Sequence, residues 1–279
     1  MELSQERADE LNALCKKFRI DVITGLYKVQ TGHPGGSLSV CEILTALYFE
    51  KAKTSGESPL DSARDRIILS KGHAAPMLYR ILAEKGYFPL RDLEHLRQFG
   101  SHLQGHPCNH ETPGVEVPTG PLGLGLGVGV GKALALKLDQ NPARVYVVLG
   151  DGELNEGTIW ESAMSAYKYK LDNLTAIVDR NHVQLDGTSD EIMPMLDIGK
   201  KFESFGFHVI TCDGHDISAL CDSLDRAKEK KGAPTVIVAE TIKGKGVSFM
   251  EGKNTWHGSP ISAELFAQAI EELGGGKHV

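Results

Sequence analysis

The stretch VYVVLGDGELNEG (residues 145–157) decides the fold. It begins with an apolar run typical of a buried β-strand and continues into a glycine-bracketed turn that carries three carboxylates, Asp151, Glu153 and Glu156. Asp-Gly is a common hairpin dipeptide, but a hairpin needs a second strand, and the following TIWESAMSAYKYK has helical spacing. The stretch therefore predicts a strand–loop–helix unit, and in open α/β sheets the loop after a strand's carboxyl end is where ligands bind.

Short apolar strands alternate with amphipathic helices along most of the chain. This alternation predicts an α/β fold, in which a parallel sheet is sandwiched by helices. Gly, Asp, Asn or Pro bounds each expected strand. The expected strands are residues 66–70, 145–149, 174–178, 208–211 and 235–239.

The front third of the chain follows a different pattern. Residues 5–30 and 37–52 are predicted to be helical, whereas residues 100–120 contain too many Gly, Pro and His residues for a regular element. A loop of that length is usually functional or disordered. Since the chain has no internal repeat and no clear linker, we expect residues 1–279 to form a single domain with a frayed tail, GGGKHV.

Composition excludes several classes of protein. A chain of 279 residues, 41% of them hydrophobic, can bury a full core, and its net charge of −7 argues against nucleic acid or an acidic membrane surface as the main partner. The sequence shows no signal-peptide pattern and no run near the ~18 apolar residues of a membrane span. The five cysteines are scattered without a CxxC pair, which argues against a disulfide framework and favours the cytoplasm.

A glycine-rich stretch, GPLGLGLGVGVGKALALKL (residues 120–138), invites comparison with nucleotide-binding loops. Its glycines from Gly123 to Gly131 all occupy odd positions, which excludes GxGxxG, and Ala133 after Gly131-Lys132 excludes a P-loop. The stretch instead predicts a tight turn and a helix with little side-chain bulk. Since glycine costs a helix interior up to ~1 kcal/mol relative to alanine, either the sheet or a ligand must approach it closely.

The carboxylates of the acidic turn would repel an anionic ligand unless a cation intervenes. Mg²⁺ binds oxygen ligands, typically one or two protein carboxylates together with substrate phosphates and water. A second oxygen donor is expected at the end of a neighbouring strand, and Asn181, 30 positions after Asp151, follows the expected strand 174–178. The helix start after the turn adds backbone N–H groups suited to anions.

Gly-Asp-Gly followed about 30 residues later by Asn is the pattern of the thiamine diphosphate-binding motif. The chain resembles the transketolase family, specifically its N-terminal, diphosphate-binding domain. The motifs that carry this resemblance occur in family order over nearly the whole chain. They are TGHPGGSLS, LSKGHAA, GHP, TGPLG, GDGELNEG, NHVQLDG and KGKGVSFMEG with the later WHG.

The resemblance implies a role for each matching position. Asp151, the side chain of Asn181 and the backbone carbonyl of Val183 would hold the metal, which is Mg²⁺ with Ca²⁺ or Mn²⁺ as substitutes. Residues that would contact the diphosphate or line the rings of the cofactor are His73, Gly120, Leu122, Gly152, Asn181, Leu185 and His257. The catalytic candidates are His33 and His106, which would face the sugar's hydroxyl groups, His257, and Glu156, which would communicate with the partner site at a subunit interface.

Other residues in these motifs have simpler interpretations. Leu124 stands where the family often has Gln, so any hydrogen bond from that amide is missing. Glu153 has no implied role and is expected to be solvated, whereas Lys243 and Lys245 are interpreted as loop or interface charges. The spacing of His102, His106, Cys108 and His110 fits neither CxxC nor HExxH, so a zinc site is disfavoured there.

The activity that the resemblance implies is transfer of a two-carbon ketol unit from a ketose phosphate to an aldose phosphate. In the family, a glutamate on a separate pyrimidine-binding domain activates the cofactor, and this chain ends soon after WHG. We therefore expect the N-terminal subunit of a split enzyme, with a C-terminal subunit that carries the missing domain, in an α2β2 assembly. Pentose phosphates are the default substrates, and unusual ketose phosphates stay open.

Two alternatives also stay open. One is a non-catalytic Mg²⁺–diphosphate-binding or regulatory module, and the other is a subunit of another thiamine diphosphate enzyme. Retention of His33, His106 and Glu156, beyond what diphosphate alone needs, counts against the first alternative.

Overall fold

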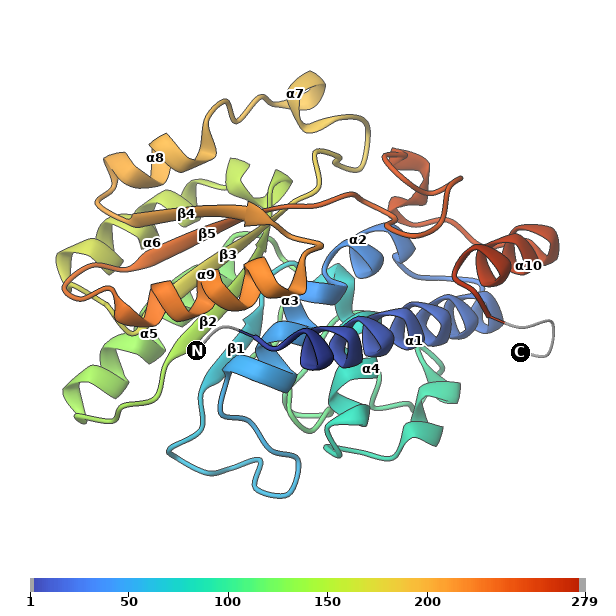
Figure 1. Cartoon of the computed structure of the whole chain (residues 1–279), viewed down its shortest axis with the longest axis horizontal. Coiled ribbons are helices and arrows are strands. Elements are labelled where there is room, and N and C mark those ends of the chain that lie inside the picture. The colour runs from blue at the N-terminus through green and yellow to red at the C-terminus, as the bar shows by residue number, and fades with distance from the viewer. Residues whose placement is uncertain (1–2, 276–279) are drawn as a thin grey trace.

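A five-stranded parallel sheet lies at the centre of the chain in the computed structural model, which describes residues 3–275 (Figure 1). Its strand order is β1-β2-β3-β5-β4, and every neighbouring pair is parallel. The α/β prediction is confirmed, and each expected strand agrees with an observed one to within two residues. The strands are β1 Arg66–Leu69, β2 Val145–Gly150, β3 Leu174–Arg180, β4 His208–Asp213 and β5 Thr235–Glu240.

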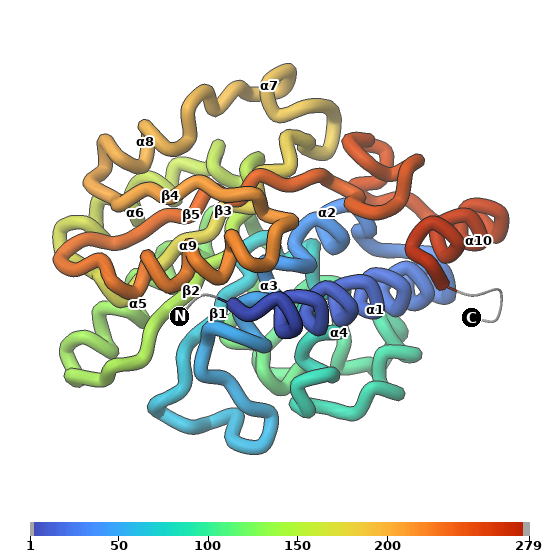
Figure 2. The backbone as a smooth tube through the Cα atoms, in the orientation of Figure 1, coloured from blue at the N-terminus to red at the C-terminus, as the bar shows by residue number. Residues whose placement is uncertain are grey.

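Helices cover both faces of the sheet and bury a separate apolar core on each face. Tyr146 and Val148 of β2 pack into one core, whereas Val145 and Val147 pack into the other. This double burial is why the strands are continuous apolar runs. The first core is covered by α1 Gln5–Val29, α3 Cys41–Ala46, α4 Ala75–Glu84, α9 Ile217–Glu229 and α10 Ala263–Glu272, and the second by α5 Leu124–Leu138, α6 Gly157–Lys168 and α8 Ile198–Ser204. Figure 2 shows α9 in front of the sheet, running along β4 and β5.

The helical front of the chain is confirmed with one correction. α1 matches the first expected helix, but the second begins earlier than expected, at α2 (Pro34–Ser39), and is interrupted at Val40 before α3 and a π-helical turn, Leu47–Lys51. Proline at the first helical position favours this early start because its φ is already helical. No helix among the described residues is long and apolar enough to cross a membrane.

The segment expected to be a loop is irregular, whereas the first two residues of the tail that was expected to be frayed are bound to the preceding helix. Residues 100–120 contain neither helix nor strand. At the tail, Gly274 and Gly275 donate their N–H groups to the carbonyls of Glu271 and Ile270 at the end of α10. The fraying expected for the rest of the tail, residues 276–279, lies outside the described residues.

The glycine-rich helix α5 lies directly against the sheet. A Cβ on Gly129 would lie 2.4 Å from Val147 Cγ2, and one on Gly125 would lie 2.3 Å from Ser70 Oγ. Close packing against the sheet therefore explains these two glycines. The register of β2 and β3 places Gly150 opposite Asp179, so the turns that follow these strands meet at one edge of the sheet.

Candidate functional site

A pocket of about 290 Å³ opens at the carboxyl ends of β2 and β3. Asp151 and Gly152 reach it from the turn after β2, and Asn181 and Val183 reach it from the loop after β3. The structure brings together every predicted metal, cofactor-binding and catalytic residue except Glu156. The predicted residues that line the pocket are His33, His73, His106, Gly120, Leu122, Asp151, Gly152, Asn181, Val183, Leu185 and His257.

Asp151 joins the two loops of the acidic side of the pocket. Its carboxylate accepts hydrogen bonds from the N–H groups of Gly152 (2.9 Å) and His182 (2.8 Å) and from Ser189 Oγ (3.0 Å). The side chain is 4% exposed. Burial, and then the nearby Asp179 carboxylate, raises the pKa of Asp151.

Four histidines lie close together in the pocket. The ring centroids of His33 and His73 are 5.6 Å apart, those of His73 and His257 are 5.0 Å apart, and His106 lies 6.0 Å from His33. These rings come from segments far apart in the sequence, so they meet only in the folded chain.

All four imidazoles are held neutral. Burial and then the Arg97 charge lower the pKa of His33 to about 4, and burial and then Lys243 lower the pKa of His257 to about 3. Burial also lowers the pKa of His73 and of His106. Neutral imidazoles both donate and accept hydrogen bonds at physiological pH, and Nδ1 of His33 is buried with no partner among the described residues.

Lys243 corrects the interpretation of the KGKG motif. The side chain is buried in the pocket, where Nζ donates to the carbonyls of Val183 (3.0 Å) and Gln184 (3.2 Å) and lies 3.0 Å from Nδ1 of His257. Burial and then the Lys71 charge lower the pKa of Lys243 to about 8. The interpretation as a loop or interface charge is therefore wrong for Lys243, whereas Lys245 does not line the pocket.

Lys71 is a second buried cation that the sequence reasoning missed. Its ammonium pairs with Asp179, which is 0% exposed, and donates to the carbonyl of Gly36 at 3.0 Å. Asp179 also accepts from the hydroxyls of Ser39 and Thr241. The position of this lysine in LSKGHAA, directly after a strand and two residues before His73, was the available signal.

Glu153 is buried rather than solvated, so that expectation is wrong. The side chain is 2% exposed, and its carboxylate accepts from Ser70 Oγ and from the N–H groups of Gly123 (2.9 Å) and Gly150 (3.0 Å). Glu156, by contrast, is exposed at the start of α6 and does not line the pocket. The three carboxylates of this turn therefore lie in three different environments.

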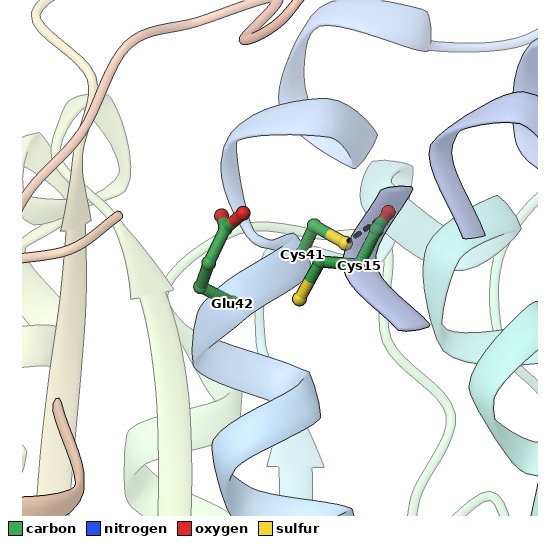
Figure 3. A group of neighbouring side chains, drawn as sticks. All are labelled: Cys15, Cys41 and Glu42. Carbon is green, nitrogen blue, oxygen red and sulfur yellow. Dashed lines mark hydrogen bonds between the residues drawn. The ribbon is translucent and has the colours of Figure 1, made fainter. Parts of the chain in front are cut away.

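The cysteine- and histidine-rich segments provide no convincing metal site among the described residues. His102 pairs with Asp92 at 3.2 Å, and within residues 3–275 the one close group of possible ligands is Cys15, Cys41 and Glu42 (Figure 3). A carboxylate oxygen of Glu42 lies within 4.8 Å of both sulfur atoms, but this carboxylate already pairs with Arg19 and with His215.

The chemistry of the Cys41 thiol also argues against a metal there. Burial raises the pKa of the Cys41 thiol, whereas metal binding needs a thiolate. The described cysteines are all free, which agrees with the expected lack of a disulfide framework.

Together, the fold and the pocket define a parallel α/β protein with a cofactor-sized site at the carboxyl ends of its strands. The family model described as "Transketolase, thiamine diphosphate binding domain" matches residues 11–278. The chain therefore belongs to the transketolase family and contains its thiamine diphosphate-binding domain, and transketolases are transferases.

Two relatives of similar length are named as subunits of transketolases. The 6-deoxy-6-sulfo-D-fructose transketolase subunit SqwG of Clostridium sp. (strain MSTE9) is 44% identical over 88% of this chain and 90% of the relative. An apulose-4-phosphate transketolase subunit of Phocaeicola vulgatus is 41% identical over 96% of this chain and 95% of the relative.

The solved transketolase of Campylobacter jejuni superposes with a TM-score of 0.89 at 32% identity. The match covers 99% of this chain but only 44% of that protein, so this chain spans less than half the length of such transketolases.

Proposed function

We propose that this chain is the thiamine diphosphate-binding, N-terminal subunit of a split transketolase. Together with a second subunit, it would transfer a two-carbon ketol unit from a ketose phosphate to an aldose phosphate. The observation that carries the proposal is the pocket itself, in which oxygen donors, neutral histidines and apolar side chains meet at one edge of the sheet. The two relatives named as subunits, which this chain covers over 90% and 95% of their lengths, support a split enzyme.

The oxygen donors of the pocket fit a hard divalent cation. Asp151, the side-chain oxygen of Asn181 and the carbonyl of Val183 come from two adjacent loops, and all three residues are buried. The Asp179 carboxylate lies close enough to help raise the pKa of Asp151, and a cation would offset this negative charge. We propose Mg²⁺ as the metal, with Ca²⁺ or Mn²⁺ as substitutes, because hard cations prefer such oxygen ligands.

The rest of the pocket fits the two ends of thiamine diphosphate. Gly152, His73 and His257 would contact the diphosphate, and the ammonium groups of Lys71 and Lys243 would offset its charge. A Cβ at position 152 would lie 2.9 Å from Gln184 Cγ, so glycine lets the Gln184 side chain pack closely against this turn. Residues proposed to line the cofactor's rings are Gly120, Leu122 and Leu185.

The cofactor, when bound, supplies the carbon nucleophile that takes up and releases the two-carbon unit. This chain's own contribution is to bind, orient and exchange protons. His33 and His106 would hold the sugar's hydroxyl groups as hydrogen-bond donors and acceptors. Because burial keeps their pKa values low, they accept a proton only transiently and are suited to relaying it.

The ring side of the pocket is open on this chain. Leu122 and Leu185 line the pocket yet are 37% and 59% exposed. A C-terminal subunit that carries the pyrimidine-binding domain would cover them, in an α2β2 assembly in which the exposed Glu156 communicates between sites. We propose that residues 1–279 act as one diphosphate-binding domain in this assembly, in the cytoplasm.

The substrates are proposed only as a class. Sugar phosphates of the pentose phosphate type are the default, and the names of the two subunit relatives point to less common ketoses for those proteins. Side chains that bind the phosphate group of the sugar would lie mainly on the partner subunit.

Two experiments test the proposal. The purified chain, with Mg²⁺, thiamine diphosphate and a ketose/aldose phosphate pair, is expected to be inactive alone and active with a partner subunit encoded by a neighbouring reading frame. Robust activity of the chain alone would contradict the split-subunit proposal. Calorimetric titration with thiamine diphosphate is expected to show binding that depends on Mg²⁺, and binding without any turnover in the completed complex would favour the non-catalytic module.

A further inference from the structure

The carboxylate of Glu153 connects two segments at the pocket, which this residue itself lines. Oε1 accepts the N–H of Gly123 at 2.9 Å together with the hydroxyl of Ser70, and Oε2 accepts the N–H of Gly150 at 3.0 Å. The side chain is 2% exposed, so water offers little replacement for these hydrogen bonds. A single buried side chain thus satisfies backbone groups from the start of α5 and the end of β2.

Gly123 is held on its other side as well. Its φ of +86° is one that residues with a Cβ rarely adopt, and a Cβ there would lie 2.7 Å from Glu156 Cβ. The Thr158 hydroxyl donates to the Gly123 carbonyl at 3.1 Å. Both backbone polar groups of Gly123 are therefore bound by the segment that follows β2.

These contacts adjoin the two proposed halves of the cofactor site. Gly123 directly follows Leu122, which we propose lines the cofactor's rings, and Gly150 directly precedes Asp151, which we propose binds the metal. One carboxylate oxygen of Glu153 binds the segment that would line the cofactor's rings, and the other binds the turn that would hold the metal. The distance between the halves is thereby set before any ligand arrives, which reduces the ordering cost of binding.

We propose that Glu153 is a positioning residue that fixes the ring-lining segment relative to the turn that holds the metal and diphosphate. This inference rests on the proposed function, since both halves are defined by the proposed cofactor. It predicts that replacing Glu153 lowers the affinity for a ligand that spans both halves more than the affinity for a ligand that occupies only one half.

The test variant is Glu153→Gln, which keeps the shape of the side chain but has only one accepting oxygen. Either Gly123 or Gly150 must then lose its acceptor. We expect hydrogen exchange of at least one of these two amides to accelerate about tenfold, and affinity for thiamine diphosphate with Mg²⁺ to fall about tenfold. Affinity for pyrophosphate with Mg²⁺, which reaches only one half, should fall less.

Matched variants separate this role from general loosening of the fold. Glu161→Gln changes an exposed glutamate on α6 and should behave like the wild-type chain in each measurement. Ser70→Ala leaves both backbone N–H groups their carboxylate acceptor and should retain their protection. Thr158→Val, at an exposed position, removes the hydrogen bond from the Thr158 hydroxyl to the Gly123 carbonyl. This variant should bind thiamine diphosphate more weakly, as Glu153→Gln does.

Several outcomes would overturn the inference. These are unchanged exchange at both amides in Glu153→Gln, equal losses of affinity for thiamine diphosphate and for pyrophosphate, and an effect of Ser70→Ala as large as that of Glu153→Gln. If the wild-type chain binds neither probe, the proposed function fails, and the amide exchange still decides separately whether Glu153 holds the two segments.

Discussion

Lys243 brings a buried positive charge into the pocket and illustrates what a single residue contributes. Its ammonium donates to the carbonyls of Val183 and Gln184 and lies against His257. Because Nδ1 of His257 faces an ammonium, which can only donate, the ring's other nitrogen carries the proton in the neutral imidazole. Lys243 therefore directs the N–H of His257 away from itself, where an anionic ligand could accept it.

Replacing Lys243 with Met should weaken thiamine diphosphate binding while leaving the fold intact. Hydrogen bonds to charged groups contribute about 1.5–3 kcal/mol, so we expect affinity to fall on the order of 10- to 100-fold in a calorimetric titration with Mg²⁺. The matched control is Lys245→Met, the other lysine of KGKG, which lies outside the pocket. Equal affinities for the two variants would show that the Lys243 charge does not act on the ligand.

The low pKa of His33 should make stability depend on pH. Its pKa is about 4 in the folded chain and 6.5 for an unperturbed imidazole, so between these values the unfolded state binds a proton that the folded state does not. Stability must therefore rise with pH across this window and level off above about 6.5. In urea unfolding from pH 4 to 8, the free energy of unfolding should fall toward low pH, and it should fall less steeply in His33→Asn. The same pH dependence in both proteins would refute the low pKa of His33.

At the scale of elements, the sequence predicts best what each segment determines by itself. The strands are recognisable because burial on both faces makes them apolar throughout, and the register of β2 and β3 brings the loops that carry Asp151 and Asn181 to one edge of the sheet. The buried states of Glu153 and Lys243 escape such reasoning. Their partners, the Gly123 amide and the Val183 carbonyl, lie 30 and 60 positions away and approach only through tertiary packing.

Helix α5 gives a stability prediction at this scale. Gly129→Ala would place a Cβ 2.4 Å from Val147 Cγ2, and such overpacking typically costs about 1–3 kcal/mol. Gly131→Ala in the same helix meets nothing within 4 Å, so it should instead stabilise the chain by about 0.5–1 kcal/mol through better helix propensity. Urea unfolding of both variants tests whether the two changes in the free energy of unfolding have opposite signs. Changes of the same sign would mean that α5 does not pack on the sheet as described.

At the scale of the whole molecule, apolar surface remains exposed on the two helices nearest the acidic turn. Leu126 and Val130 of α5 face the core, whereas Leu124 and Val128 are 53% and 40% exposed. Met164 on α6, which packs beside α5, is 55% exposed. Together with the open ring side of the pocket, these side chains are typical of a surface that another protein covers.

Assembly with further subunits should therefore depend on the end of α5 that adjoins the pocket. Val128→Lys would bury an unpaired charge, which costs several kcal/mol in an interface, so we expect association to weaken at least about tenfold. Leu138→Lys, at the opposite end of the same helix and 74% exposed, is the matched control. Sedimentation velocity of the chain, alone and mixed with the candidate partner, measures association, and activity of the mixture should fall in parallel. If Val128→Lys assembles as the wild-type chain does, this surface is not where the subunits meet, and the partner must reach Leu122 and Leu185 from another direction.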